Sequence, residues 1–157
     1  MTINARQAQE DKSPPDIQTL LARVMEAFEH LGPDNLDAVQ GLYAEDIYFE
    51  DPAHGIQGLA ALMSYFKVLF ANVERCQFRF HQAVPMGDDL FMSWTMLVQH
   101  RKLRGGELIR VEGVSYLKTR NGKVYYHRDY FDMGAMVYEN VPLLGSIVRA
   151  IKQRLGQ

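Results

Sequence analysis

Residues 121–132, NGKVYYHRDYFD, join a turn signal directly to a strand. Asn-Gly is the strongest short signal for a two-residue turn between antiparallel strands, because both central residues of that turn need a positive φ. The residues after the turn are rich in aromatic side chains, which are typical of strands. The run before it, ELIRVEGVSYLK at residues 107–118, is strand-like as well. The sequence therefore predicts an antiparallel hairpin near the C-terminal end.

Two more predicted strands precede this hairpin. CQFRFHQAV at residues 76–84 alternates apolar and polar side chains with period two, whereas LFMSWTMLV at residues 90–98 is apolar on both faces. A strand that is apolar on both faces needs two dry environments. One would be a helix layer, and the other a partner sheet or an enclosed cavity. Trp94, on this strand, is therefore expected either in the core or in the wall of a pocket.

The N-terminal part of the chain predicts helices instead. Asp16 is placed as an N-cap, and apolar residues follow it at helical spacing until Gly32-Pro33. A short helix, a short strand at residues 46–51 and a third helix come next. Helices first and strands afterwards predict an α+β fold, in which a curved antiparallel sheet wraps around the N-terminal helices and forms a cone-shaped pocket. We expect a flexible arm at residues 1–15 and a single domain at residues 16–157.

The composition of the chain argues against several classes of protein and of binding site. The chain has 157 residues, is 47% hydrophobic and has a formal net charge of −2, which argues against a nucleic-acid protein that binds mainly through phosphate contacts. The single cysteine, Cys76, allows neither an internal disulfide nor a zinc site made of several thiolates. No histidine spacing typical of a metal site and no glycine-rich phosphate loop is present. We therefore expect no metal and no cofactor. The low cysteine content fits the reducing cytoplasm, so we also expect a cytoplasmic protein.

The strand YYHRDYFD carries the first candidate site. Period two places four of its side chains on one face: Tyr125, His127, Asp129 and Phe131. Asp129 and His127 are then about 6–7 Å apart at the backbone, close enough to interact directly or through one water. The pair is read either as an acid–base site or as a structural ion pair. The two other charged residues, Arg128 and Asp132, are expected on the opposite face, where each would pair across the sheet or at a dimer contact.

A second candidate site follows the short strand. Asp51 precedes Pro52, which favours extended backbone at the end of a strand. It is either a general base at the mouth of a pocket or a turn aspartate that accepts hydrogen bonds from nearby backbone N–H groups. His54, in the following turn, either points into the pocket mouth or is solvated.

The stretch LDAVQGLYAEDIYFEDPAHGIQG at residues 36–58, together with YYHRDYFD, resembles the nuclear transport factor 2-like superfamily and within it the SnoaL-like polyketide cyclase group. Ketosteroid isomerase and limonene-epoxide hydrolase are enzymatic relatives in that superfamily. The resemblance covers about residues 16–135. It implies a curved sheet wrapped around helices, a deep pocket without a metal or cofactor, and a homodimer that forms through the outer face of the sheet.

The resemblance also implies roles for single residues. Asp51 matches the aspartate that moves a proton between carbons in ketosteroid isomerases. The tyrosine and the protonated acid that hold the enolate oxygen in that family fall near Phe28 and Val114, which donate no hydrogen bond to an oxyanion.

Asp129 matches a catalytic carboxyl of limonene-epoxide hydrolase, and Tyr48 matches a tyrosine that helps hold the attacking water. The catalytic Arg and Asp of that enzyme fall near Thr95 and Leu97, and Glu50 replaces an asparagine. SnoaL-type cyclases need only an aspartate as acid–base catalyst in an apolar pocket.

The C-terminal run VPLLGSIVRAIKQRLGQ, at residues 141–157, predicts a basic amphipathic helix. Such a helix either lies on a membrane or packs on its own domain or a partner subunit, and packing is the favoured reading.

Two functions remain open. The first is a cofactor-independent cyclase, isomerase or hydratase that transfers protons on a small apolar substrate. Its catalytic residues would be Asp129, Asp51 and His127, and its substrate contacts Tyr48, His54, Trp94, Tyr125 and Phe131. The second is a module that binds a small hydrophobic ligand or a partner without catalysis.

Overall fold

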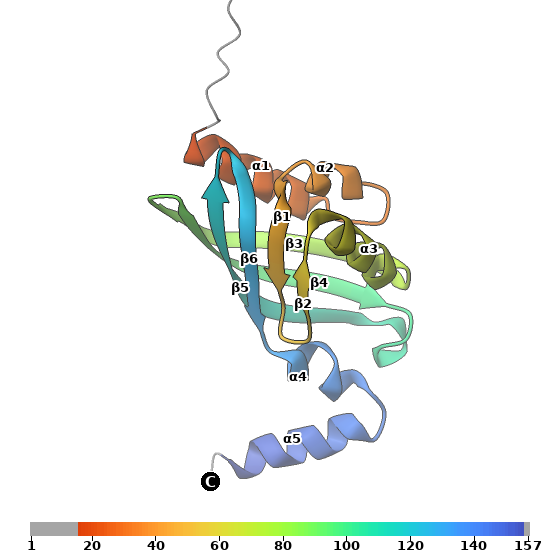
Figure 1. Cartoon of the computed structure of the whole chain (residues 1–157). Helices are drawn as coiled ribbons and strands as arrows, with labels where there is room; N and C mark the ends of the chain where they lie inside the picture. Colours follow the sequence, from red (N-terminus) through yellow and green to blue (C-terminus); the bar gives the residue numbers. More distant parts are fainter. Residues whose placement is uncertain (1–15, 156–157) are drawn as a thin grey trace, which may run out of the picture.

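A strongly curved sheet of six strands forms the centre of the computed structural model, which describes residues 16–155 (Figure 1). The predicted flexible arm at residues 1–15 lies outside the described residues. The spatial order of the strands is β2-β1-β6-β5-β4-β3. Their bounds are β1 Tyr43–Glu50, β2 Gly55–Gln57, β3 Val73–Met86, β4 Asp89–His100, β5 Leu108–Arg120 and β6 Lys123–Phe131.

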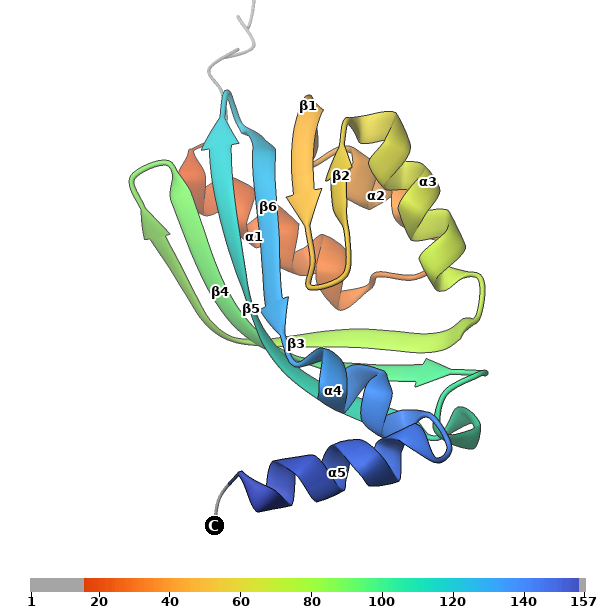
Figure 2. The same ribbon diagram turned by 60° about the horizontal axis from the view of Figure 1, so that its bottom comes forward.

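The helices of the first half lie on the concave side of this sheet (Figure 2). They are α1 Ile17–Glu29, α2 Leu36–Gln40 and α3 Leu59–Phe70. A short helix, α4 Met133–Met136, follows the last strand, and two one-turn 3₁₀ helices span η1 Arg104–Gly106 and η2 Tyr138–Asn140. The chain ends in α5 Leu144–Arg154, which lies apart from the sheet and next to α4 (Figures 1 and 2). The predicted α+β fold is confirmed.

The Asn-Gly turn has the geometry that the sequence predicts. Asn121 and Gly122 both have positive φ, 53° and 70°, and Arg120 pairs with Lys123 across the turn. β5 and β6 are antiparallel along their length. One pairing departs from a purely antiparallel sheet, because β1 runs parallel to β6 through residues 48–50. These two strands are far apart in sequence, so no hairpin dictates their relative direction.

The N-terminal helix starts and packs as predicted. The carboxylate of Asp16 accepts a hydrogen bond of 2.7 Å from the backbone N–H of Thr19, which satisfies one free donor of the first turn. The apolar side chains at helical spacing, Leu20, Val24 and Phe28, are buried against the sheet. Burial of this stripe closes the concave side of the sheet at one end.

The two faces of β4 meet different surroundings. Its inner side chains are buried in the core: Leu90, Met92, Trp94, Met96 and Val98. On the outer face, Phe91 stacks on Tyr116 with ring centroids 4.6 Å apart and stays partly exposed. Among residues 16–155, no helix is both long and apolar enough to cross a bilayer.

Candidate functional site

A cavity of about 230 Å³ opens between the concave face of the sheet and helices α1, α3 and α4. Most of its wall is apolar: Phe28, Leu31, Phe49, Ala53, Phe66, Leu69, Phe70, Phe78, Trp94, Met96, Phe131, Met133, Met136 and Val137. The ionisable groups in the wall are Asp51, His54, Tyr65, Cys76 and Asp129. Burial raises the pKa of the Cys76 thiol to about 12, so this thiol stays protonated. Both predicted catalytic carboxylates therefore line one cavity.

Asp129 is held through one of its two carboxylate oxygens. Its Oδ1 accepts a hydrogen bond of 2.5 Å from Ser115, which lies directly opposite on β5. The Nε2 of His127 lies 2.8 Å from the same oxygen. The other oxygen, Oδ2, makes no hydrogen bond to a described residue. Among residues 16–155, every buried side-chain oxygen has a hydrogen-bond partner, so Oδ2 is not buried. Oδ2 is therefore the oxygen that is open to the cavity.

The direction of these bonds follows from the groups around them. The indole N–H of Trp94 can only donate, and it donates to Ser115 Oγ at 2.8 Å. The Ser115 hydroxyl must then give its own hydrogen to Asp129. Because Oδ1 already accepts from Ser115, a proton that Asp129 gains is carried on Oδ2. The oxygen of Asp129 that can carry a proton therefore lies on the cavity side.

His127 is buried on β6 among aromatic rings. Its Nδ1 lies 2.7 Å from the hydroxyl of Tyr43, and the rings of Phe28 and Phe49 lie 5.8 and 5.1 Å away. Burial, together with the negative charge of Asp129, raises the pKa of Tyr43 well above its ordinary value, so the phenol keeps its proton. A phenol that donates to Nδ1 leaves the hydrogen of the imidazole on Nε2, which lies against Asp129 Oδ1.

Asp51 is held through both oxygens. Oδ1 accepts hydrogen bonds of 2.7 Å from the backbone N–H groups of Ala53 and His54, and Oδ2 accepts one from the hydroxyl of Tyr65. Burial and the bond to Asp51 raise the pKa of Tyr65, which therefore stays a donor. Asp51 therefore has both positions that the sequence offered as alternatives. It accepts hydrogen bonds from the backbone of the turn, and it also lines the cavity. His54 lies 3.5 Å from Asp51 and is 57% exposed at the cavity opening.

Two predicted substrate contacts lie away from the cavity. The ring of Tyr48 stacks on Tyr126, with centroids 6.0 Å apart, on the outer side of the sheet. Tyr125 is the extra residue of a bulge, since Val124 pairs with Thr119 while Tyr126 pairs with Lys118.

This bulge changes which side chains share a face. It interrupts the period-two alternation of β6, so Tyr125 does not share the face of His127 and Asp129. Its ring lies 4.8 Å from the guanidinium of Arg120 instead. Arg128, on the outer face, pairs with Glu50 at 3.2 Å. Asp132 caps α4 and pairs with Lys152 at 2.9 Å.

Three residues of the site were missing from the sequence reading: Tyr43, Tyr65 and Ser115. Tyr65 lies three residues after Leu62 and four before Leu69, within the apolar stripe of α3. Ser115 lies at period two between the buried residues Val111 and Leu117 on β5. A single hydroxyl at a core position was therefore a readable signal for a group that needs a polar partner.

A family model for the SnoaL-like domain matches residues 23–127, which is more than half of the chain. The chain belongs to the SnoaL-like domain family. No curated protein matches the sequence significantly. Within residues 16–155 of this SnoaL-like protein, no group of three or more His, Cys, Asp or Glu side chains is arranged to hold a metal ion.

Solved structures share the fold of this SnoaL-like protein. One is described as a candidate SnoaL-like polyketide cyclase from Shewanella putrefaciens CN-32, with TM-score 0.65, 20% identity and coverage of 78% of this chain and 93% of that chain. An epoxide hydrolase from M. tuberculosis, described as LEH-like, has TM-score 0.64 and 19% identity, with coverage of 78% and 89%. A hypothetical protein with a ketosteroid isomerase-like fold from Catenulispora acidiphila DSM 44928, in complex with trimethylamine, has TM-score 0.67 and 17% identity, with coverage of 78% and 93%.

Proposed function

We propose that this SnoaL-like protein is an enzyme that transfers a proton on a small, largely apolar substrate and needs no cofactor. The observation that carries the proposal is the carboxylate of Asp129, whose Oδ1 is fixed by Ser115 and His127 while Oδ2 is open to an apolar cavity. A positioned carboxylate in a dry site is suited to general acid–base catalysis.

In this proposal Oδ2 of Asp129 takes a proton from a carbon or from a water and later returns it. Ser115 and His127 keep their hydrogen bonds to Oδ1 throughout, so they orient the carboxylate without exchanging a proton. Tyr43 fixes the tautomer of His127 from behind. His127 is therefore proposed as a positioning residue, and Asp129 as the group that touches the substrate.

Asp51 and Tyr65 supply the second polar point of the cavity. Asp51 accepts three hydrogen bonds. One of them comes from Tyr65, whose phenol also lines the cavity and keeps its proton because its pKa is raised. We propose that Asp51 acts as the second acid–base group. The polar atom of a bound substrate would then replace part of the contact between Asp51 and Tyr65.

The size and polarity of the cavity indicate the substrate class. Its volume of about 230 Å³ is below the range of about 300–1,000 Å³ that is usual for drug-sized ligands. A ketone, enol or epoxide with a short hydrocarbon skeleton fits these limits. Isomerisation, aldol-type cyclisation and hydration all need a proton transfer of this kind. Related folds described as a cyclase and an epoxide hydrolase support the same range.

A second candidate function is the binding of an apolar ligand without catalysis. The observation that favours it is the absence of any Lys or Arg from the wall of the cavity, as far as the structure describes the chain. Phe28, near the position of the oxyanion tyrosine in ketosteroid isomerases, contributes only a hydrocarbon ring to that wall.

The test follows proton exchange rather than one product. A panel of small ketones in D₂O is monitored by NMR for loss of α-protons, and a panel of epoxides for diol formation. Asp129→Asn should lower the rate on any active substrate by about 10²–10⁴-fold, with unchanged circular dichroism. Asp46→Asn, which removes an exposed carboxylate that pairs with Arg120, is the matched control and should leave the rate unchanged.

The outcomes separate the two functions. Unchanged turnover in Asp129→Asn would show that the assignment of Asp129 is wrong. If the wild-type protein binds members of the panel but turns over none of them, the ligand-binding function is correct instead.

We also propose a homodimer that forms through the outer face of the sheet. Phe91, Val114 and Tyr130 are large apolar side chains exposed on that face, and Val114 lies directly opposite Tyr130. Val114→Asp should therefore shift the mass of the particle from dimer to monomer in light scattering.

A further inference from the structure

The apolar side of α5 is turned away from the rest of the molecule. Its large aliphatic side chains are between 40% and 85% exposed: Leu143, Leu144, Ile147, Ile151 and Leu155. They recur at helical spacing and make one stripe along the helix. A helix that packs on its own domain through its apolar side buries such a stripe. In α5 the stripe is exposed, so the helix contacts its domain through another side.

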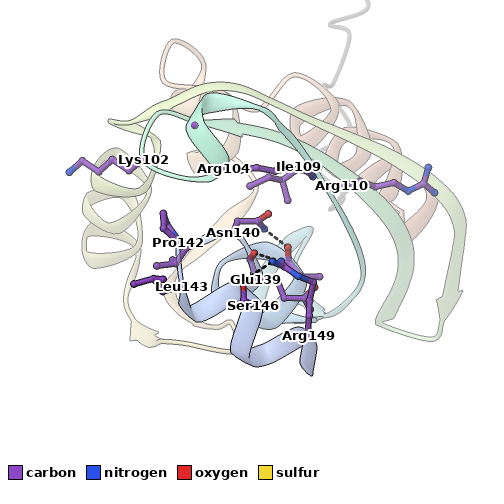
Figure 3. Close-up of a pocket in the computed structure, with 13 residues that line it drawn as sticks. Lys102, Arg104, Ile109, Arg110, Glu139, Asn140, Pro142, Leu143, Ser146 and Arg149 are labelled. Carbon is purple, nitrogen blue, oxygen red and sulfur yellow. Dashed lines mark hydrogen bonds between the residues drawn. The ribbon is translucent and has the colours of Figure 1, made fainter. Parts of the chain in front are cut away.

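The polar side of α5 is the side that attaches to the body. Gly145 lies so close to η2 that a Cβ there would be 2.2 Å from the carbonyl oxygen of Glu139. Arg149 donates a hydrogen bond of 2.9 Å to the same carbonyl, as Figure 3 shows. Lys152 pairs with Asp132 and with Glu139. Ion pairs and one close backbone contact therefore hold α5 with its apolar stripe outward.

The charge around α5 is positive. Residues 141–155 contain three basic residues, Arg149, Lys152 and Arg154, and no acidic one, although the whole chain has a net charge of −2. Arg154 and Lys102 make no ion pair with a described residue, and Arg149 binds a carbonyl rather than a carboxylate. A separate cleft of about 670 Å³ lies between residues 102–110 and the segment from η2 to α5. Lys102 lies at its rim, and the side chain points outward (Figure 3).

We propose that α5 binds the surface of an anionic lipid bilayer, with its aliphatic stripe among the acyl chains and Arg154 and Lys102 at the headgroups, while Arg149 and Lys152 hold the helix to the body. Basic amphipathic helices with exposed Leu and Ile bind at such interfaces through apolar burial and through attraction to anionic lipids. A second copy of the chain is the less suitable occupant, because two such helices would bring together the Arg154 side chains of both copies, and residues 141–155 contain no acid to offset them.

The position of α5 in the molecule is compatible with binding to a membrane surface. It projects at one end of the molecule, beyond α4 (Figures 1 and 2). Because its apolar side chains are also exposed, a flat surface can contact them. Met133 and Met136 of α4 line the cavity, and α4 also contacts η2, to which α5 is attached. Lipid binding would thus place the surface near the cavity. The inference holds whether or not the cavity is catalytic.

Flotation with vesicles tests the proposal on the full chain. One set of vesicles contains phosphatidylcholine and phosphatidylglycerol in equal amounts, and the other phosphatidylcholine alone. The wild-type protein should float with the anionic vesicles, and less so as the salt concentration rises. The double variant Ile147→Asp/Ile151→Asp should bind at least about tenfold more weakly. Both side chains are exposed, so the fold should not change.

The matched control is Val68→Asp/Met86→Asp, which places the same charges on exposed apolar positions of α3 and β3 and should bind as the wild type does. Equal flotation of the Ile147→Asp/Ile151→Asp variant and the wild type would overturn the proposal. So would failure of the wild type to float with anionic vesicles. Light scattering without lipid gives a third outcome: if the same variant lowers the mass of the particle, a second copy covers α5 and the lipid proposal is wrong.

Discussion

Helices α1 and α5 have the same kind of sequence and opposite orientations. Both are amphipathic, with 13 and 11 residues. In α1 the apolar stripe is buried, and Leu20 and Val24 are each 1% exposed. In α5 the apolar stripe faces outward, and Ile147 and Ile151 are 58% and 54% exposed. Spacing therefore predicts a helix and its apolar side, but does not show what that side contacts.

The difference comes from the partner that each helix meets. α1 lies against β3 on the concave face of the sheet, where an apolar surface is available. α5 meets η2, whose exposed backbone carbonyl at Glu139 and whose carboxylate attract cations instead. Hydrogen bonding to these groups places the basic side of α5 inward.

The largest expected effect is on α1. Leu20→Ala should lower the free energy of unfolding by about 2–5 kcal/mol, because it removes a buried side chain and leaves a cavity. Ile151→Ala on α5 should change it by less than about 0.5 kcal/mol, since that side chain is already in solvent. Urea unfolding of the two variants measures the contrast. A loss of stability in Ile151→Ala as large as in Leu20→Ala would mean that the stripe of α5 is buried in solution.

A smaller and local effect is expected at Gly145. A Cβ at this position would overlap the carbonyl of Glu139, so Gly145→Ala should weaken the attachment of α5 by about 1–3 kcal/mol. Hydrogen exchange should speed up in residues 144–154 and stay unchanged in β4 and β5. Gly41→Ala is the control, because Gly41 has helical φ and ψ and room for a Cβ at 3.5 Å. Unchanged exchange in α5 of Gly145→Ala would contradict the packing described.

The smallest effect is on the pH dependence of the same attachment. The hydrogen bond from Lys152, with those from the N-terminus of α4, lowers the pKa of Asp132 below its ordinary value of 3.8. A lowered pKa in the folded state means that the carboxylate stabilises the fold above pH 3.8, and that this contribution is lost as the pH falls through the folded pKa. The protection of the α5 amides relative to their intrinsic exchange rates should therefore fall below about pH 4 in the wild type. Asp132→Asn should show fast exchange already at neutral pH. A pH profile in Asp132→Asn equal to that of the wild type would show that this ion pair does not hold the helix.

Much of the fold could be predicted because its signals are local. The Asn121-Gly122 turn, the N-cap at Asp16 and the stripes of α1 and α3 each depend on residues a few positions apart. The parallel pairing of β1 with β6 could not be predicted in this way, because it joins segments about 80 residues apart. The bulge at Tyr125 could not either, since the sequence gives no sign that the alternation of β6 is interrupted there.

The residues of the candidate site also fall into two groups, those that local sequence identifies and those that only the folded chain brings together. Asp129, His127 and Asp51 could be named from a strand pattern, a residue before proline and a resemblance to known proteins. Their partners come from elements distant in sequence: Ser115 and Trp94 from β5 and β4, Tyr43 from β1, and Tyr65 from α3. A hydroxyl at a core position, such as Ser115, shows in the sequence that a polar partner is needed, but only the folded chain shows which group that partner is.

The sequence by itself determined most of the helices and strands (though not β2), the membership in the SnoaL-like family and the two carboxylates, because periodicity, turn chemistry and short motifs act over a few residues. Only the tertiary structure decided that Asp51 and Asp129 share one cavity, which oxygen of Asp129 is open to it, and that α5 presents its apolar side outward. Those properties depend on which groups meet across the fold, where burial and hydrogen-bond partners are set by residues far apart in the chain.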